Sequence, residues 1–398
     1  MTIDSGSKPR RLRGTGATLD GMFVGSICRD SRSVAHSPHA ALVVVGEATV
    51  SDLDDSFGAF LFERTVLAQD VVNHLMVHRL PFVAGVPEAR LLENGDVVSI
   101  ESGGETVNLL HDSRLKEAFV VVNQRCNCNC IMCPDSESQR RRDPYLSVRD
   151  LTALVSLLPD DLQHLTVTGG EPTIVPERLF AVLRQRALRP YDSHCLLLTN
   201  GRMCCYSDFA EELAAALGGR STVSVPVHGP DAALHDEITR VQGSFDQTIA
   251  GIHNLLALGV STEIRVVVSQ QNYDRSQEIA HFVASTFPEV QRAIFVTLEM
   301  MGNAAKNRSQ VWVNYEVLRG PVVRAAAILL AARVPVVFYN FPLCHLPKDF
   351  RALAQQSISA HKVAFPVECS ACVLMKSCCG FFSSTLRQMK PTVIPIGA

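Results

Sequence analysis

The sequence predicts an α/β fold: six β/α units forming a partial barrel, a small β-containing domain before it and a cysteine-rich region after it. From about residue 118, short apolar runs alternate with amphipathic stretches, as in repeated β/α units. Before that point, the runs GDVVSIES and ETVNLL are typical of paired strands. Near the other end, Cys344 precedes closely spaced cysteines between residues 369 and 379.

Length and composition set the expected organisation. With 398 residues, 47% of them hydrophobic, the chain can bury the core of one large domain plus one or two small ones. We expect four segments, which are a flexible basic tail at 1–20, a small N-terminal domain of unassigned role at 21–115, the barrel at 116–310 and the cysteine-rich region at 311–398.

The six strands of the expected barrel are short apolar runs separated by helical candidates. The clearest helix contains Phe245, Ile249, Ile252 and Leu255 at helical spacing, and Gly259 can end it. The strands are expected at 118–123, 164–168, 195–199, 221–227, 262–268 and 293–298.

The loops after these strands carry the polar and metal-binding residues. In parallel β/α barrels, the loops that follow the strands gather around one opening and carry the chemistry. Here a cysteine loop follows the first strand and GGEPT (169–173) follows the second. TNG (199–201) follows the third, and further polar segments follow the others. We therefore expect one site at this rim.

The cysteine loop, VVNQRCNCNCIMCPDS, is the most informative segment. Cys126, Cys130 and Cys133 have the spacing C-x3-C-x2-C. With 13 cysteines in 398 residues, chance would produce this spacing in roughly 1% of such chains. Three thiolates can hold three irons of a four-iron cluster and leave the fourth iron open. Cys128 is expected to be a small semi-buried thiol rather than a ligand.

This loop resembles that of the radical SAM superfamily. The resemblance implies a TIM-like partial barrel with a 4Fe–4S cluster on Cys126, Cys130 and Cys133. The open iron would bind S-adenosylmethionine, whose reductive cleavage gives a 5′-deoxyadenosyl radical. The residue before the third Cys is usually aromatic in this superfamily and packs near the adenine; here it is Met132, whose thioether can also lie against a ring.

GGEPT supports the same interpretation. Gly169 and Gly170 would let the backbone approach a ligand closely at positive φ, and the Glu171 carboxylate would bind an ammonium group. The resemblance implies that this segment, including Pro172, binds the methionine amino group. Further candidates for the ribose or carboxylate of the nucleotide lie at strand ends, with Asn200 and Ser224 preferred over Thr199 and Arg265. The sequence identifies no catalytic acid or base.

The C-terminal cysteines form a second candidate metal site. Cys344 is remote, and Cys369, Cys372 and Cys378 have the spacing C-x2-C-x5-C. Four soft ligands suit an auxiliary iron–sulfur cluster or a structural zinc ion. The spacing resembles the extensions called SPASM or twitch domains, and we expect an auxiliary 4Fe–4S cluster. Cys379 is an alternative to Cys378 as the fourth ligand.

The segment from about residue 93 to 383 is similar to the radical SAM maturases of the His-Xaa-Ser system. The similarity includes ENGDVVSI, GGEPT, EIRVVV, QSIS and the terminal cysteine run. It implies a ribosomally made precursor peptide as substrate, and an electron donor such as flavodoxin or ferredoxin as partner. A second maturase is a further candidate partner. Precursor recognition is one role open to the N-terminal domain.

Two other functions remain open from the residues. One is a radical SAM enzyme of small-molecule cofactor biosynthesis, of tetrapyrrole or pterin type, because related architectures serve both. The other is a zinc-binding interaction module without catalysis. His74 and His78 could share a helix face, but no acidic or Cys partner stands nearby, so a partly buried helix surface is expected.

Charge and hydropathy exclude several classes. A net charge of −3 with a pI near 6.5 gives no reason to expect nucleic acid or an anionic membrane as partner. The sequence shows neither a transmembrane span nor a signal peptide, so a cytoplasmic location is expected. In a reducing cytosol, clustered cysteines more often bind metal or act in catalysis than form disulfides.

Overall fold

The computed structural model describes residues 8, 10–16, 22–29, 39–101, 103, 105–141, 146–189, 193–359 and 362–397. Most of the expected basic tail lies outside the described residues. The chain divides into two compact units. The first comprises Met1–Val122, Pro144–Val167 and Val175–Cys195, and the second Asn123–Asp143, Thr168–Ile174 and Leu196–Ala398.

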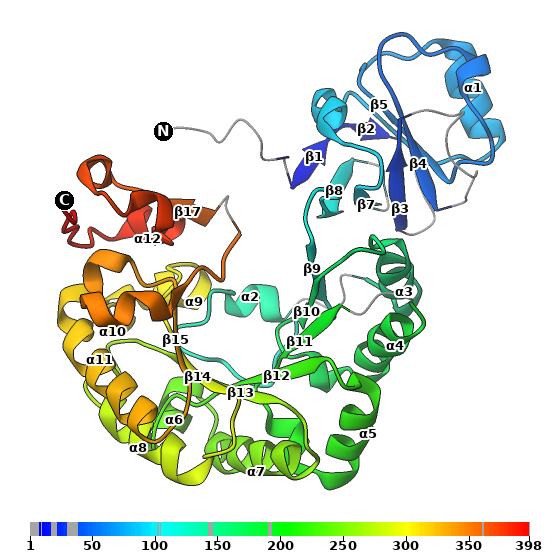
Figure 1. The fold of residues 1–398 in the computed structure, drawn as a ribbon. Coiled ribbons are helices and arrows are strands. Elements are labelled where there is room, and N and C mark those ends of the chain that lie inside the picture. Colours follow the sequence, from blue (N-terminus) through cyan, green and yellow to red (C-terminus); the bar gives the residue numbers. More distant parts are fainter. Residues whose placement is uncertain are drawn as a thin grey trace. The chain divides into compact units, whose positions relative to one another are not determined.

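The first unit contains an eight-stranded mixed sheet in the order β1-β8-β7-β3-β4-β5-β6-β2 (Figure 1). Strands β3 to β6 pair in parallel, whereas β7 and β8 are antiparallel, which confirms the expected pairing of these two runs. The strands are β1 Arg11–Arg13, β2 Thr15–Gly16, β3 Phe23–Cys28, β4 Ala40–Val44, β5 Ala59–Phe62, β6 Phe82–Ala84, β7 Val97–Ile100 and β8 Thr106–His111.

Both faces of this sheet are buried. Along β5, Ala59 and Leu61 pack into one apolar cluster while Phe60 and Phe62 pack into another, because successive side chains of a strand point to opposite faces. Helix α1 (Gln69–Val77) covers the second cluster through Val71 and Leu75. Two short 3-10 helices, η1 (Val50–Asp52) and η2 (Pro87–Leu91), complete this part of the unit.

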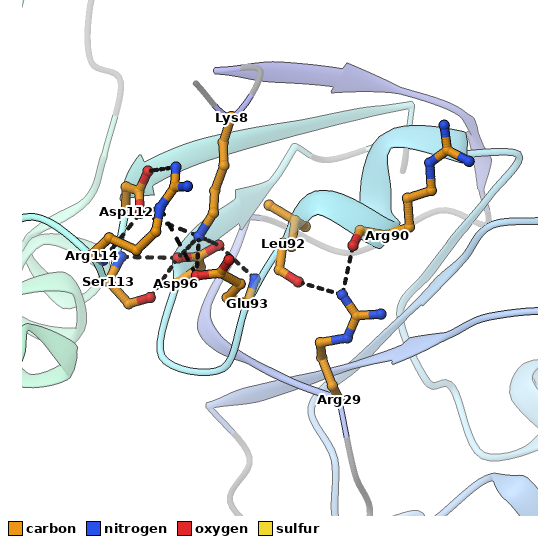
Figure 2. Close-up of polar contacts among 9 residues, drawn as sticks. All are labelled: Lys8, Arg29, Arg90, Leu92, Glu93, Asp96, Asp112, Ser113 and Arg114. Atoms are coloured by element: carbon orange, nitrogen blue, oxygen red, sulfur yellow. Dashed lines mark hydrogen bonds and ion pairs between the residues drawn. The ribbon is translucent and has the colours of Figure 1, made fainter. Parts of the chain in front are cut away.

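A buried ionic cluster stabilises the β7–β8 end of this sheet (Figure 2). Lys8 Nζ lies 2.8 Å from both carboxylate oxygens of Asp96 and 3.2 Å from Asp112 Oδ1. The side chains of Lys8 and Asp96 are 3% and 0% exposed. Burial alone would raise the pKa of Asp112, but hydrogen bonds from Arg114 and Lys8 outweigh it and hold that pKa well below its ordinary value of 3.8.

A second eight-stranded sheet has the order β16-β15-β14-β13-β12-β11-β10-β9, so that strands consecutive in sequence are neighbours. The pairs from β12 to β16 are parallel. This confirms the partial barrel, with eight strands rather than six. Its strands are β9 Glu117–Val121, β10 His164–Thr168, β11 His194–Leu198, β12 Ser221–Pro226, β13 Thr262–Val267, β14 Arg292–Val296, β15 Val336–Tyr339 and β16 Ala354–Gln355.

The first six strands lie within two residues of their expected bounds, and the sequence prediction missed β15 and β16. Helices separate most of the strands, as the β/α pattern requires. They are α2 Glu137–Arg140, α3 Val148–Leu157, α4 Pro176–Ala187, α5 Ser207–Leu217, α6 Ala232–Thr239, α7 Ser244–Ala257, α8 Ser276–Thr286, α9 Gly302–Lys306, α10 Arg308–Val311 and α11 Tyr315–Ala331.

Helix α7 shows how local sequence sets these bounds. The Asp236 carboxylate accepts hydrogen bonds from the backbone N–H groups of Gly243 (2.6 Å) and Phe245 (2.8 Å), which caps the first turn. Ile252 and Leu255 are fully buried, as their spacing predicts. Gly259 follows the last turn with φ of +72°, a conformation that favours glycine and ends the helix.

The C-terminal region consists of short elements. Strands β17 (Val363–Ala364) and β18 (Phe381–Phe382) form an antiparallel pair, and α12 (Ser383–Gln388) follows. Tyr315 and Phe381 pack against Cys369 in a small apolar cluster. Among the described residues, no helix combines the length and the apolar character that crossing a membrane requires.

Candidate functional site

The cysteine loop follows β9 and lies in the second unit. Its thiols are close to one another. The backbone N–H of Cys128 donates to Cys126 Sγ at 3.4 Å, and the N–H of Cys133 donates to the carbonyl of Cys130 at 3.2 Å. Burial raises the pKa of the Cys133 thiol. None of the 13 cysteines, all of which are described, forms a disulfide.

Segments much later in the chain hold this loop by its backbone. Asn303 Nδ2 donates to the carbonyl of Cys130 at 3.0 Å, and Asn307 Nδ2 donates to the carbonyl of Ile131 at 2.9 Å. The N–H of Ile131 donates to the carbonyl of Ile238 at the end of α6, at 2.9 Å. The loop conformation is thus set by α6 and α9 as well as by its own sequence.

The segment after β11 holds the other side of the loop. Asn200 Nδ2 donates to Asn127 Oδ1 at 2.7 Å, and Arg202 Nη1 donates to the carbonyl of Asn127 at 2.7 Å. Both nitrogens also lie 3.5 Å from Cys128 Sγ. Hydrogen bonds from the Cys126 and Cys130 thiols, together with Arg202, lower the pKa of Cys128, so this thiol lies beside two of the three expected ligands.

GGEPT approaches the cysteine loop so closely that a side chain would not fit. A Cβ on Gly169 would lie 2.4 Å from the carbonyl oxygen of Asn123, and one on Gly170 would lie 2.3 Å from that of Arg125. Neither glycine has positive φ, so that expectation is wrong. In the described structure the two glycines permit close contact between two loops.

Glu171 joins three segments at the centre of the site. Its side chain is buried, and Oε1 accepts hydrogen bonds from Thr173 Oγ1 (2.6 Å) and Thr199 Oγ1 (2.7 Å). Oε2 accepts from the N–H of Asn200 at 2.6 Å. Burial raises the pKa of Glu171 above its ordinary value, and these hydrogen bonds offset only part of that rise. Pro172 is buried beside it and begins the 3-10 helix η3, Pro172–Ile174.

The remaining predicted contact residues lie in different surroundings. Ser224 is 1% exposed on β12, and its Oγ has no hydrogen-bond partner among the described residues. Arg265 on β13 donates to Glu263 Oε1 at 3.2 Å, and its guanidinium lies 5.4 Å from the Tyr339 ring centroid. Met132 is buried in an apolar cluster that includes Leu234.

His228 belongs to the polar segment expected after the fourth strand, whereas His235 was expected to be structural rather than catalytic. His228 lies two residues after β12, its Nδ1 is buried without a hydrogen-bond partner among the described residues, and its N–H donates to His235 Nδ1 at 3.2 Å. Burial lowers the pKa of His228 to about 3 and that of His235 to about 4, so both rings are neutral at pH 7. The sequence could place His228 after the strand but not its contact with His235, because that contact joins a strand end to a helix.

Residues 120–283 match the profile of the Radical SAM superfamily. The chain carries a radical SAM domain. Such domains bind S-adenosylmethionine and a 4Fe–4S cluster. An AdoMet-dependent heme synthase of Nitratidesulfovibrio vulgaris is 28% identical over 164 residues, which are 40% of this chain and 42% of that protein. Mycofactocin maturase MftC of Mycobacterium tuberculosis is 30% identical over 160 residues, 39% of this chain and 38% of that protein.

The chain therefore spans about two fifths of the length of both curated relatives. Among solved structures, Streptococcus suis SuiB bound to the precursor peptide SuiA aligns with a TM-score of 0.46 and 16% identity. The alignment covers 56% of this chain and 48% of SuiB. Native anSMEcpe with bound AdoMet and a Kp18Cys peptide aligns with a TM-score of 0.44 and 14% identity, over 55% of this chain and 63% of that chain.

The residues of the radical SAM domain fit these cofactors. Thiols are the ligands of iron–sulfur clusters, and the loop presents Cys126, Cys130 and Cys133 together. Buried polar atoms without a partner are rare, and such an atom can mark the place of a missing ligand. Three such atoms follow or lie on the strands of this region, Asn123 Oδ1, Ser224 Oγ and His228 Nδ1.

The C-terminal cysteines line a pocket. It includes all four expected ligands, Cys344, Cys369, Cys372 and Cys378, among apolar side chains such as Phe365, Met375, Phe381, Val393 and Ile394. The expected remote cysteine and the expected close triplet therefore do come together in the fold. Burial raises the pKa of Cys369 to about 11. Binding a metal would have to displace this proton.

The two adjacent cysteines of this region differ in their contacts. Cys378 Sγ lines the pocket and accepts hydrogen bonds from the N–H groups of Leu343 (3.3 Å) and Gly380 (3.4 Å). Such N–H···S contacts stabilise a thiolate. Cys379 does not line the pocket; its Sγ lies 3.0 Å from the carbonyl oxygen of Phe341, and its thiol also hydrogen-bonds Cys378 and lowers the pKa of Cys378. The geometry thus favours Cys378 as the ligand.

Proposed function

We propose that this chain is a radical SAM enzyme that modifies a ribosomally made precursor peptide of the His-Xaa-Ser type. Cys126, Cys130 and Cys133 would hold the 4Fe–4S cluster and leave one iron for S-adenosylmethionine. When bound, this cofactor pair supplies a 5′-deoxyadenosyl radical for hydrogen abstraction. The proposal rests on one observation. The loop that carries the three thiols is held by Asn200, which follows β11, and by Asn303 and Asn307, which follow β14.

The protein residues would bind and orient the nucleotide. We assign Gly169, Gly170, Glu171 and Pro172 to the methionine end of S-adenosylmethionine, because Oε2 of the buried Glu171 has one acceptor position left. Asn200, Ser224, Arg265 and Met132 are proposed as the other contacts. The unpartnered Ser224 Oγ supports this, since a bound hydroxyl or carboxylate would satisfy it.

The C-terminal pocket would hold an auxiliary 4Fe–4S cluster on Cys344, Cys369, Cys372 and Cys378. Its thiol-only donor set and apolar lining support this assignment. With four cysteine ligands, this cluster would have no open iron, so it would position the peptide or accept an electron. A structural zinc ion on the same cysteines is the competing occupant.

The peptide substrate is supported by the resemblance to His-Xaa-Ser maturases and by the 30% identity to a protein named a mycofactocin maturase. We further propose the limits 21–115, 116–310 and 311–398 for the three domains. An electron donor such as flavodoxin or ferredoxin, a second maturase and a cytoplasmic location complete the proposal.

Anaerobic cleavage of S-adenosylmethionine tests the proposed chemistry. Protein reconstituted with iron and sulfide, then reduced, should be brown and should release 5′-deoxyadenosine. Replacing Cys130 by Ala should abolish this product, whereas replacing the half-buried Cys205, which is outside both cysteine groups, should leave it. Full cleavage by the Cys130→Ala variant would refute the assignment of the loop, and colourless protein with zinc at both sites would establish the non-catalytic module.

A small-molecule substrate is the second candidate function. It is favoured by the similarity to an AdoMet-dependent heme synthase, which is 28% identical over 164 residues. Adding a peptide with His-Xaa-Ser repeats to the same reaction distinguishes the two. A peptide mass change that depends on S-adenosylmethionine supports the maturase. Cleavage without any change in the peptide supports the small-molecule enzyme.

A further inference from the structure

Asp55, His74 and His78 come together on the surface of the first unit, far from the cysteines in sequence. His74 Nε2 lies 2.7 Å from Asp55 Oδ1, and His78 Nδ1 lies 2.8 Å from Asp55 Oδ2. These nitrogen and oxygen atoms all lie within 4.8 Å of one another. The fold brings Asp55 to the two histidines from a turn that lies 19 residues before His74.

One apolar core anchors both sides of this cluster. Val71 and Leu75 of α1 are fully buried in it, and His74 and His78, one turn apart, lie on the adjacent face of the helix. Phe57, which is 1% exposed, belongs to the same core and ends the turn that carries Asp55. The three side chains are therefore held together by packing beneath them.

The other carboxylates of this turn are engaged locally. Asp52 Oδ2 accepts hydrogen bonds from the N–H (2.8 Å) and the Oγ1 (2.7 Å) of Thr49. Asp54 Oδ1 accepts from the Oγ (2.6 Å) and the N–H (3.0 Å) of Ser56. These contacts fix the backbone on both sides of Asp55 and turn its carboxylate toward the helix. The three donor groups are thus already neighbours before any ion binds.

We propose that Asp55, His74 and His78 form a binding site for a divalent transition ion of the zinc class. Two imidazole nitrogens and one carboxylate suit Zn²⁺, whereas Mg²⁺ and Ca²⁺ prefer oxygen ligands throughout. Without the ion, both ring nitrogens can donate a proton to the carboxylate; the ion would replace these protons. The imidazole rings are stacked with centroids 4.3 Å apart, and each presents a nitrogen to the Asp55 carboxylate.

The site leaves room for a fourth ligand from outside the chain. His78 and Asp55 are 45% and 42% exposed at their side chains. Three protein ligands with an open position are typical of zinc sites that exchange water or another ligand. The ion would also join the 50–57 turn to α1, and binding to the folded state alone would stabilise the first unit.

Zinc content measured on the full chain tests the site. The protein is first reconstituted with iron and sulfide so that the cysteines are occupied, then incubated with Zn²⁺ and desalted. We expect about one zinc per wild-type chain. The variants His78→Gln and Asp55→Asn should lose this zinc, because their affinity for it should be tenfold or more weaker. The matched control is His281→Gln, which replaces an exposed histidine on α8 and should keep the zinc.

Cobalt gives a second measurement that is independent of protein yield. Co²⁺ added to the same protein should produce a ligand-field absorption without thiolate charge-transfer bands, and His78→Gln should lack it. Circular dichroism checks that this variant keeps its helices. Equal zinc in wild type and His78→Gln, or cobalt bands of thiolate type, would overturn the proposal. Neither result depends on cleavage of S-adenosylmethionine, so the radical SAM assignment is tested separately.

Discussion

Lys8 shows how strongly a single residue can depend on its partners. Its ammonium group is buried beside Asp96, which is itself fully buried and also accepts hydrogen bonds from the N–H and Oγ of Ser113, both at 2.9 Å. Removing one member of such a pair leaves an unpaired charge in a low-dielectric environment. Lys116 and Asp161 form the opposite case, because both side chains are about half exposed.

Replacing Lys8 by Met should destabilise the first unit by about 3–5 kcal/mol, since Asp96 would lose its counter-ion. Replacing Lys116 by Met should cost less than about 1 kcal/mol, because solvent screens the exposed pair. Hydrogen exchange of the β7 and β8 amides measures the opening free energy of this sheet directly. Similar effects of the two substitutions would contradict a stabilising role for the ionic cluster.

The buried histidines His228 and His235 predict an acid sensitivity. Their pKa values in the fold, about 3 and about 4, lie below the ordinary value of 6.5, so the unfolded chain binds more protons on acidification. The free energy of unfolding is therefore highest above about pH 6.5, and it decreases as the pH falls toward 4, because protons then bind these two rings in the unfolded chain. Acidification from pH 7.5 to 5.5 should lower the free energy of unfolding by about 1.4 kcal/mol for each of the two histidines.

Urea unfolding of the metal-free protein at the two pH values checks this prediction. The midpoint should fall on acidification, and His235→Gln should reduce that fall. His281→Gln is the control, because His281 is exposed and its loss should leave the pH dependence unchanged. An unaltered pH dependence in His235→Gln would show that this ring does not remain neutral in the fold.

At the scale of elements, the loop contacts of the site depend on small residues. Gly170 faces the carbonyl oxygens of Arg125 and Gln124, where an added Cβ would lie 2.3 and 2.4 Å away. Neither oxygen belongs to a flexible side chain, so the cysteine loop would have to move. In contrast, a Cβ on Gly219, in the turn after α5, would meet nothing within 4 Å.

Gly170→Ala should therefore lower the iron content of reconstituted protein by displacing the Cys126–Cys133 loop, whereas Gly219→Ala should leave it unchanged. A displacement of 1 Å in a preorganised site can reduce activity about 100-fold, and the release of 5′-deoxyadenosine should fall accordingly. Normal iron content and cleavage in Gly170→Ala would mean that the loop contact can relax without consequence.

At the scale of the whole molecule, two groups of cysteines lie on separate parts of the second unit, one in the loop after β9 and one in the C-terminal pocket. If each holds its own cluster, Cys378→Ala should lose about half of the iron, since that cluster would lack one ligand. Cys379→Ala should keep it, because Cys379 binds the Phe341 carbonyl instead.

Iron analysis of the two variants, together with the release of 5′-deoxyadenosine, checks the independence of the sites. Both variants should still cleave S-adenosylmethionine, because the loop after β9 is intact in each. Loss of iron in Cys379→Ala but not in Cys378→Ala would mean that Cys379, and not Cys378, is the ligand.

The sequence predicted the repeating architecture well because each β/α unit carries its own local pattern. Six strands and the α7 region follow from apolar runs and helical spacing. Strand β15 was missed because a four-residue apolar run after Pro335 does not distinguish strand from helix, and β16 has only two residues.

For the site, spacing found the cysteines and GGEPT but not the residues that hold them. Asn303 and Asn307 bind the backbone of the cysteine loop from 173 and 176 residues away, respectively. Such contacts leave no trace in local sequence. The partnership of Asp55 with His74 and His78 is hidden for the same reason, because the turn and the helix that carry these residues meet only in the fold.

Attachment of the cysteine loop by Asn303 has a consequence for biosynthesis. During translation the thiols leave the ribosome 174 residues before the amide that binds Asn129, a delay of roughly 10–35 s at bacterial elongation rates. Throughout this interval the nascent loop lacks the contacts that Asn303 makes in the fold. A cluster on these cysteines would therefore gain this support only once α9 has been synthesised.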